Sequence, residues 1–223
     1  MNQEKFQATI GYQFKRVKLL EQALTHRSFS RNINNERLEF LGDSVLNLVI
    51  SRHIYQREPD ANEGELSRMR ASLVNEEALA QVARDINLGE YINLGGGELK
   101  SGGSRRASIL SDTMEAIFGA IYLDSGFTQA QQTILFLYDE YIQTLADTET
   151  LKDPKTRLQE FLQAQKIDLP EYTVAKTVGK SHNQTFTVTC RIDTLKLQTS
   201  GKGSSRKKAE QAAADRAFQK LKR

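Results

Sequence analysis

The sequence lacks several features that define common protein classes. It has one cysteine, Cys190, which excludes an internal disulfide framework and fits a reducing compartment. No cysteine–histidine set has zinc spacing, and we interpret His26 and His53 as structural because neither has a nucleophile with an orienting partner. No apolar run approaches the roughly 18–20 residues that span a bilayer, and the N-terminal segment has no secretory-signal pattern. We therefore expect a soluble, cytoplasmic protein with no membrane partner.

Net charge is also small, at +3, but it is unevenly distributed. Residues 1–152 contain 16 Lys and Arg against 21 Asp and Glu, a balance of −5. Residues 153–223 contain 15 against 7, a balance of +8. This asymmetry predicts an acidic module joined to one that binds a polyanion.

Proline is scarce, and one of the three marks a domain boundary. Residues 147–152 are short, polar and almost free of large apolar side chains. Asp153 followed by Pro154 is a helix start signal, with Asp as the N-cap and Pro at the first helical position. We predict a first domain over residues 1–146, a linker over 147–152 and a second domain over 153–223.

The first domain has helical periodicity almost throughout, which predicts an all-α fold. Asn75 is placed as an N-cap, and Gly89 and Gly126 are placed at helix C-termini. Pro59 falls in a loop between helices. The expected helices cover residues 17–24, 36–55, 65–74, 76–88, 108–123 and 128–145.

The second domain changes period and predicts a small α+β fold with helices on one face of an antiparallel sheet. Alternating, β-branched segments predict strands, and alanines in the last segment allow that helix to lie close to the sheet. The expected order is a helix over residues 155–165, strands over 172–178, 186–192 and 195–199, and a helix over 205–221.

Residues 36–46 contain the most informative segment. On a helix, Glu36, Glu39 and Asp43 fall on one side. An ordinary amphipathic helix with a solvated acidic face is the alternative, but the i,i+4 repulsion of Glu39 and Asp43 is unfavourable. Gly42 in mid-helix costs about 0.5–1 kcal/mol and suggests close approach of another backbone. Phe40 lies on the acidic side, where a solvated face has no use for it.

A second acidic pair, Asp112 and Glu115, lies in a segment that is apolar on nearly every side. No Lys or Arg occurs from residue 107 to 146 to pair with these two. Buried, unpaired carboxylates usually coordinate a metal or shift their pKa values. Oxygen ligands from two helices suit Mg²⁺ or Mn²⁺. Glu63 is a weaker candidate, since alone it is an ordinary helix N-terminal charge.

The glycine-rich segment 95–103 does not match a phosphate loop, because the required glycine and the preceding hydrophobic strand are missing. We predict a flexible loop there. Three nearby cations could still contact a polyanion: Lys100, Arg105 and Arg106.

The second domain carries a candidate surface for binding a polyanion. Residues 201–208 place cations at a helix N-terminus, which is unfavourable for the helix dipole unless a phosphate is bound. A solvated basic terminus is the alternative. One polar face of the first helix suits sugar hydroxyls, and His182 in the connecting loop could reach the same target. That polar face consists of Thr156, Gln159, Glu160 and Gln163.

Taken together, these motifs resemble the ribonuclease III family. Residues 36–46, Glu-Arg-Leu-Glu-Phe-Leu-Gly-Asp-Ser-Val-Leu, match its signature. Residues 60–70, and 97–103 together with the acidic pair at 112 and 115, resemble its further blocks. Residues 153–222 resemble a double-stranded-RNA-binding domain. The resemblance covers nearly the whole chain, in the order of the short bacterial enzyme.

The resemblance implies a dimeric, Mg²⁺-dependent or Mn²⁺-dependent endonuclease that cuts double-stranded RNA and leaves 5′-phosphate and 3′-hydroxyl ends. Precursors of ribosomal RNA and structured mRNAs are the implied substrates. Phe40 matches a residue that inserts into the partner subunit. By position, Glu39, Asp43, Asp112 and Glu115 match metal ligands, with Asp43 and Glu115 most critical for catalysis and Glu36 and Glu63 as supporting acids. In the second domain, Gln159, Glu160 and His182 match minor-groove contacts, and Lys207 and Lys208 match phosphate contacts.

Two other functions are compatible with parts of the chain. A non-catalytic double-stranded-RNA-binding or ribosome-assembly protein would not need an intact set of acids, and here every acidic position is kept. A metal-dependent nucleotide hydrolase would leave residues 153–223 unexplained, and the chain has no paired His–Asp metal motif.

Overall fold

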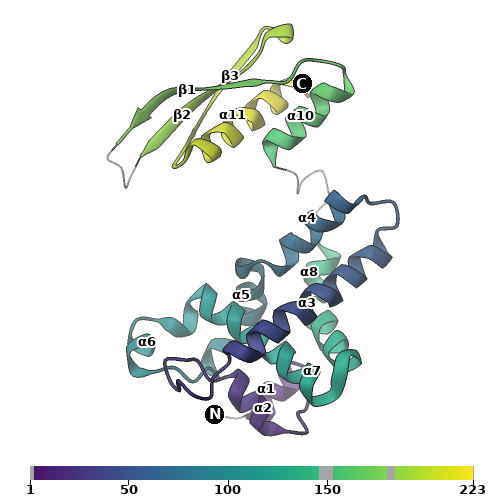
Figure 1. The fold of residues 1–223 in the computed structure, drawn as a ribbon, viewed down its shortest axis with the longest axis vertical. Helices are drawn as coiled ribbons and strands as arrows, with labels where there is room; N and C mark the ends of the chain where they lie inside the picture. The colour runs from purple at the N-terminus through teal and green to yellow at the C-terminus, as the bar shows by residue number, and fades with distance from the viewer. Residues whose placement is uncertain (1–2, 146–152, 180–183, 223) are drawn as a thin grey trace. The chain divides into compact units, whose positions relative to one another are not determined.

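The computed structural model describes residues 3–145, 153–179 and 184–222 (Figure 1). The chain divides into two compact units, Met1–Ala146 and Asp147–Arg223. The predicted linker over residues 147–152 and the predicted RNA contact His182 lie outside the described residues. Within the described ranges, none of the helices has both the length and the apolar character needed to cross a membrane.

The first unit is helical, as predicted. Its α-helices are α1 Gln3–Thr9, α2 Val17–Ala23, α3 Glu36–Arg57, α4 Glu63–Val74, α5 Glu76–Asp85, α6 Gly96–Lys100, α7 Ala107–Leu137 and α8 Asp139–Gln143. Two short 3-10 helices, η1 Leu88–Glu90 and η2 Gly103–Arg105, lie before and after α6. Helix α1, which buries Phe6 in the core, was not predicted from the sequence.

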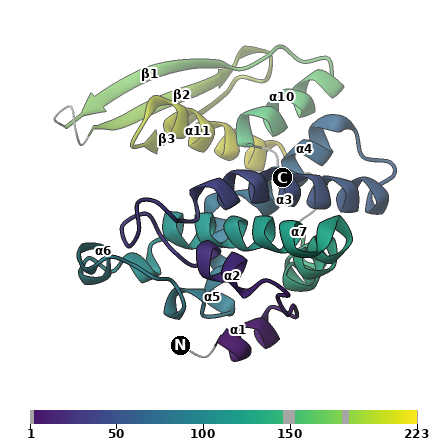
Figure 2. The same ribbon diagram turned by 60° about the horizontal axis from the view of Figure 1, so that its bottom comes forward.

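Helix α7 forms the centre of this unit. Its apolar residues occupy nearly all sides, and Met114, Ile117 and Phe118 are fully buried. Helix α3 runs beside it, as both ribbon views show (Figures 1 and 2). A helix that is apolar all round must be covered on every side, which explains why α3, α5 and α2 all pack against α7.

Glycines allow α3 and α7 to touch through their main chains. A Cβ atom at Gly42 would lie 1.7 Å from the carbonyl oxygen of Glu115, and one at Gly119 would lie 2.3 Å from that of Leu38. Only glycine permits such an approach. The close backbone contact predicted from Gly42 is therefore confirmed, and it brings the two acidic segments together.

Three local predictions need correction. Helix α5 ends at Asp85, and Asn87, not Gly89, adopts the left-handed conformation that follows it, with φ 53°. Gly89 is instead needed because a Cβ atom there would lie 2.1 Å from the carbonyl oxygen of Ser104. The segment predicted as a flexible loop contains α6, where Glu98 pairs with Arg106 at 2.9 Å. Local polar contacts order this glycine-rich chain.

At Gly126 a break is present as predicted. Its φ of 80° and ψ of −176° interrupt the helical conformation within α7, so the segment consists of two helical parts. Glycine adopts this conformation without the penalty that a side chain would impose.

The second unit is the predicted α+β domain. Its elements are α10 Pro154–Ala164, β1 Glu171–Val178, β2 Thr185–Ile192, η3 Asp193–Leu195, β3 Leu197–Gly203 and α11 Arg206–Leu221. The strands form an antiparallel sheet in the order β1-β2-β3, and both helices lie on one face (Figure 1). The enclosed core contains Leu158, Leu162, Cys190, Ile192, Ala213 and Phe218.

The third strand differs from its predicted range of 195–199. A 3-10 turn over Asp193–Leu195 and a left-handed Lys196 delay its start. It then continues through Gly203, since Gly201 lets the strand approach α11 closely. A Cβ atom at Gly201 would lie 2.2 Å from the amide nitrogen of Ala213. The expected close packing of the alanine-rich helix is thus also aided by glycine in the strand.

Candidate functional site

The α3 acids lie on the first three turns of that helix. Glu36 and Asp43 are exposed, and Glu39 between them is half-buried. Glu36 forms an ion pair with Arg27 at 3.3 Å. Asp43 accepts a hydrogen bond from the amide of Asn47 at 2.8 Å. The i, i+3 and i+7 spacing therefore places three carboxylates along one side of α3.

The α7 acids lie next to the glycine crossing. Asp112 and Glu115 are half-buried, and the hydroxyl of Ser111 donates to Asp112 at 3.3 Å. In the part of the chain that the structure describes, no hydrogen bond or ion pair reaches the Glu115 carboxylate. Glu115 is thus a partly buried acid without a compensating partner.

Electrostatic coupling joins both groups of acids. Burial, together with the charges of Asp43, Glu39 and Asp112, raises the pKa of Glu115 to about 8. Burial also raises the pKa of Glu39, with additional repulsion from Asp112 and Glu36. The four acids predicted to act together, Glu39, Asp43, Asp112 and Glu115, therefore repel one another.

Two basic side chains, His26 and Arg27, also affect the pKa of Asp112. Burial raises its pKa, while Ser111, His26 and Arg27 act in the opposite direction. The Nδ1 atom of His26 lies 2.8 Å from the Ser28 hydroxyl oxygen and 3.2 Å from the Ser28 amide nitrogen. His26, interpreted as structural from the sequence, lies beside the acids.

The donor chemistry of the four acids fits a hard divalent cation, since all are carboxylate oxygens with excess negative charge. A bound cation would relieve the repulsion that raises the pKa of Glu115. Among the described residues, however, no three acidic, histidine or cysteine side chains lie close enough together to enclose an ion. The individual ligand assignments therefore remain predictions.

Glu63 does not belong to the group of four coupled acids. It is exposed in the first turn of α4 and accepts a hydrogen bond from Ser67 at 2.7 Å. Its charge is not among those that raise the pKa of Glu115. Asn62 and Glu65 form a capping box at the same helix end. A role for Glu63 as a supporting acid remains a prediction.

A polar cavity of about 730 Å³ opens beside the acids. Glu39 and Asp112 line one part of it. Another part is lined by His26, by Arg106, which the sequence suggested as a polyanion contact, and by Arg27 and Arg31, which were not predicted from the sequence. No spacing rule links residues 26–31 to either acidic helix, since the irregular segment between α2 and α3 places them there.

Phe40 belongs to an apolar stripe on the solvent side of α3. Its side chain is 78% exposed, and Leu48 and Tyr55 are 56% and 71% exposed. Residues separated by seven or eight positions return to the same side of a helix. Of these three residues, only Phe40 stood out in the sequence.

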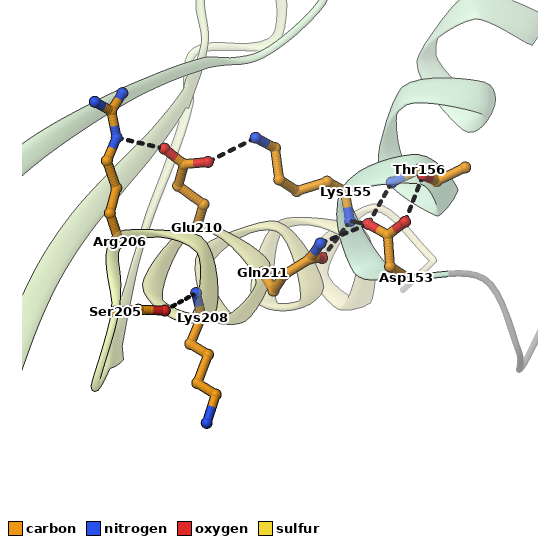
Figure 3. A network of polar contacts seen from close by, with 8 residues as sticks. All are labelled: Asp153, Lys155, Thr156, Ser205, Arg206, Lys208, Glu210 and Gln211. Atoms are coloured by element: carbon orange, nitrogen blue, oxygen red, sulfur yellow. Dashed lines mark hydrogen bonds and ion pairs between the residues drawn. The ribbon is translucent and has the colours of Figure 1, made fainter. Parts of the chain in front are cut away.

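The second unit joins the N-terminal ends of its two helices through a polar network (Figure 3). Asp153 caps α10 and accepts a hydrogen bond from Gln211 of α11 at 2.7 Å. Lys155 forms an ion pair with Glu210 at 2.7 Å, and Arg206 pairs with the same carboxylate at 2.8 Å. The network fixes the two helix ends relative to each other.

The predicted RNA contacts lie around these ends. Ser205 caps α11, and the Lys208 side chain points away from the network (Figure 3). The hydroxyl of Thr156 donates to Asp153 at 2.6 Å, so its hydrogen is already engaged. The remaining described candidates are exposed on α10 and at the start of α11: Gln159, Glu160, Gln163 and Lys207.

Family models match both units. A model described as ribonuclease-III-like matches residues 16–141, and the double-stranded RNA binding motif matches residues 154–221. The curated Ribonuclease 3 of Histophilus somni is 54% identical over 100% of this chain and 99% of its own length. The Ribonuclease 3 of Actinobacillus pleuropneumoniae serotype 3 is 54% identical over 99% of each chain.

Solved structures of the nuclease domain of ribonuclease III from Campylobacter jejuni are also similar. One has a TM-score of 0.62 and 44% identity, covering 65% of this chain and 99% of its own. The other has a TM-score of 0.61 and 46% identity, covering 62% and 97%. The latter is described as showing flexibility in a region involved in dimer formation.

Proposed function

The chain belongs to the ribonuclease III family, and from this premise we propose that it is an endoribonuclease specific for double-stranded RNA. The observation that supports this proposal most directly is the mutual coupling of Glu39, Asp43, Asp112 and Glu115 across α3 and α7. Keeping like charges together in a half-buried site is unfavourable unless a cation is bound there. An enzyme that needs a bound cation to hydrolyse a phosphodiester has a reason to keep these mutually repelling carboxylates together.

Family membership implies a requirement for a divalent metal ion. We propose Mg²⁺, which Mn²⁺ can replace, held by Glu39, Asp112 and Glu115. When bound, the cation supplies electrostatic stabilisation of the charge that develops on the transferring phosphate. Asp43 is exposed and already held by Asn47, and we assign it the orientation of the attacking water. Hydrolysis then leaves 5′-phosphate and 3′-hydroxyl ends.

RNA recognition is assigned to the second unit. The exposed amides of α10 would contact 2′-hydroxyls in the minor groove, and Lys207 and Lys208 would contact phosphates. The network around Asp153 and Glu210 supports this role, because it holds the two contact surfaces at a fixed separation. Such a domain reads the A-form shape over about 16 bp, largely without sequence specificity. Precursors of ribosomal RNA and structured mRNAs are the proposed substrates.

We also propose that two copies assemble through α3. The apolar stripe of Phe40, Leu48 and Tyr55 is exposed on the same helix that carries Glu39 and Asp43. An exposed row of large apolar side chains is typical of an interaction surface. Dimerisation would therefore bring two acidic sites to the same duplex.

The nuclease proposal is tested by cleavage of a labelled RNA duplex. Wild-type protein with Mg²⁺ should cut the duplex, and a chelator should stop the reaction. Glu115→Gln should lower the rate by at least about a hundredfold, since it removes a charge that acts directly at the cation site. Reaction products are separated on a denaturing gel.

Glu21→Gln is a matched control, because Glu21 is exposed on α2 and lies outside the cavity beside the acids. It should cut at the wild-type rate. An intact duplex after incubation of the wild type with Mg²⁺ or Mn²⁺ would favour the non-catalytic RNA-binding alternative. Wild-type cleavage by Glu115→Gln would show that the assigned site is wrong.

A further inference from the structure

The cavity beside the acids has a basic wall that metal binding does not explain. Arg27 and Arg31 reach it from the segment between α2 and α3, and Arg106 reaches it from the residue before α7. Three guanidinium groups thus gather at one opening in a unit whose overall charge is negative. Three guanidinium groups on one part of a cavity favour an anionic ligand at that part.

All three guanidinium groups are accessible to a ligand. Arg31 is exposed, and its guanidinium has no hydrogen bond or ion pair among the described residues. Arg27 and Arg106 are 70% and 46% exposed, although each pairs with one glutamate. Ion pairs this exposed contribute only about 0–1 kcal/mol. Each arginine can therefore exchange its partner for a phosphate, which guanidinium binds through two parallel hydrogen bonds.

Helix α7 adds to the same preference. It begins at Ala107 without a side-chain cap, and Ser108 and Ile109 line the cavity with the arginines. The first amide groups of a helix point away from its body, and the N-terminal end carries partial positive charge. In this 31-residue helix that end lies at the basic wall, so it strengthens the attraction of an anion without being the sole basis for a site.

The cavity has an acidic part as well as a basic one. Besides the three arginines, its lining contains four carboxylates, those of Glu36, Glu39, Glu98 and Asp112. Glu36 and Glu98 pair with Arg27 and Arg106, whereas Glu39 and Asp112 belong to the acids proposed to hold the cation. One cavity therefore offers a place for a cation beside a place for an anionic group.

We propose that Arg27, Arg31 and Arg106 form a subsite for one backbone phosphate of the RNA duplex, adjacent to the phosphate that is cleaved. This inference rests on the proposed nuclease function, and it specifies which side chains bind the phosphate next to the cleaved one on the same strand. Glu39 and Asp112 line the same cavity as the arginines, whereas Asp43 and Glu115 are not in its lining. A strand held at the basic wall therefore presents its neighbouring phosphate to Glu39 and Asp112. The arginines are positioning residues, since they do not touch the reacting atoms.

The test measures RNA binding by full-length Arg27→Gln/Arg31→Gln as a function of salt. Binding is measured with Ca²⁺ in place of Mg²⁺, because Ca²⁺ also binds carboxylate oxygens. Loss of one phosphate contact should reduce the slope of log K against log salt by about 1. The dissociation constant should rise roughly tenfold. With Mg²⁺, KM should rise by a similar factor while kcat changes less than about twofold, as expected for loss of uniform binding.

Two further variants separate the subsite from a general charge effect. Arg27→Lys/Arg31→Lys keeps both charges and should retain the wild-type salt slope. Lys15→Gln/Lys18→Gln removes two exposed charges outside the cavity and should also retain that slope. Both arginine side chains are exposed, so the melting temperature of the glutamine variant should match that of the wild type.

A glutamine variant with the wild-type slope and affinity would overturn the proposal. An equal loss of slope in the lysine-to-glutamine control would also overturn it, because the effect would then be non-specific. Failure of the nuclease proposal gives a different result, in which the wild type binds the duplex but never cuts it with Mg²⁺ or Mn²⁺.

Discussion

At Gly42 a single methyl group would collide with the main chain of another helix. Its carbon would lie 1.7 Å from the carbonyl oxygen of Glu115, far closer than any non-bonded carbon and oxygen approach each other. Gly42→Ala must therefore push α3 away from α7, and it should lower the free energy of unfolding by about 2–4 kcal/mol. Urea denaturation followed by circular dichroism measures the change.

Gly97→Ala is the matched control for this substitution. Gly97 is also helical, but nothing lies within 4 Å of the position that its Cβ atom would occupy. Alanine there should leave stability unchanged or raise it by up to about 1 kcal/mol, because it favours the helix. Equal effects of both substitutions would mean that helix propensity, not the α3–α7 contact, determines the cost.

The raised pKa of Glu115 predicts how stability changes with pH in metal-free protein. The folded state holds this proton up to about pH 8, whereas the ordinary value is 4.5. Unfolding therefore releases a proton between these values, so stability falls as pH rises from about 4.5 to 8 and levels off above. At pH 8.5 with chelator, Glu115→Gln should raise stability by about 1–2 kcal/mol, allowing for solvent screening.

Differential scanning calorimetry of metal-free Glu115→Gln and wild type tests this expectation at pH 8.5 and pH 5. The gain in melting temperature should shrink at pH 5, where wild-type Glu115 is already protonated. A constant difference at both pH values would contradict the assigned titration. The exposed Glu21→Gln should change the melting temperature little at either pH.

Individual residues were predictable where their chemistry conflicts with their surroundings. Glu39 and Asp43 repel on one helix face, Gly42 weakens its own helix, and Glu115 lacks a basic partner, so each stands out in the sequence itself. Arg27 and Arg31 give no such signal. They lie in irregular chain, whose path depends on contacts that sequence periodicity does not encode.

At the scale of elements, the start of α10 controls how the two helices of the second unit are joined. Asp153 accepts hydrogen bonds from the Thr156 hydroxyl and from Gln211 of α11, at 2.6 and 2.7 Å. Asp153→Ala removes the cap and this link together, and it should cost about 1–2 kcal/mol locally. Amide hydrogen exchange in α10, measured by mass spectrometry of the full chain, should become faster.

Asp153→Asn keeps an acceptor oxygen and is the comparison for that variant. It should retain most of the protection, since asparagine is also a good N-cap. Partial burial acts to raise the pKa of Asp153, but the hydrogen bonds prevail and lower it. Its stabilisation is therefore present above the ordinary pKa and is lost as pH falls through the folded value. Unchanged exchange in Asp153→Ala would show that the cap is dispensable.

Elements with strong periodicity or clear caps were predicted well, including the helix that starts at Pro154 and the first two strands. The errors occurred where distant contacts override local preference. The glycine-rich chain forms α6, in which Glu98 pairs with Arg106 beyond the helix, and β3 extends to Gly203, where glycines let α11 pack closely against the strand. Such contacts exist only after the chain has folded, so sequence patterns alone do not report them.

At the scale of the whole molecule, the exposed stripe on α3 predicts the effect of Phe40→Ala. If Phe40 anchors the second copy, its truncation should weaken the dimer by about 2 kcal/mol or more, roughly thirtyfold in the dissociation constant. Sedimentation velocity at low micromolar concentration measures the monomer fraction. Phe136→Ala is the control, since Phe136 is 62% exposed on α7, away from that stripe.

An unchanged sedimentation coefficient for Phe40→Ala across the concentration range would contradict an interface at this stripe. Equal dissociation in both variants would point to a different surface that depends on overall apolar area. Because Phe40 lies one residue after Glu39, loss of the dimer should also lower cleavage activity more than RNA binding.

The contact between Gly42 and Gly119 has a consequence for how this protein can change over time. Two helices that meet through main-chain atoms hold their separation independently of the volume of neighbouring side chains. Apolar residues elsewhere in the unit can therefore drift among similar sizes, altering thermal resistance while the spacing between opposing carboxylates stays constant. Thermal stability can thus change during evolution without a change in the geometry of the acidic site.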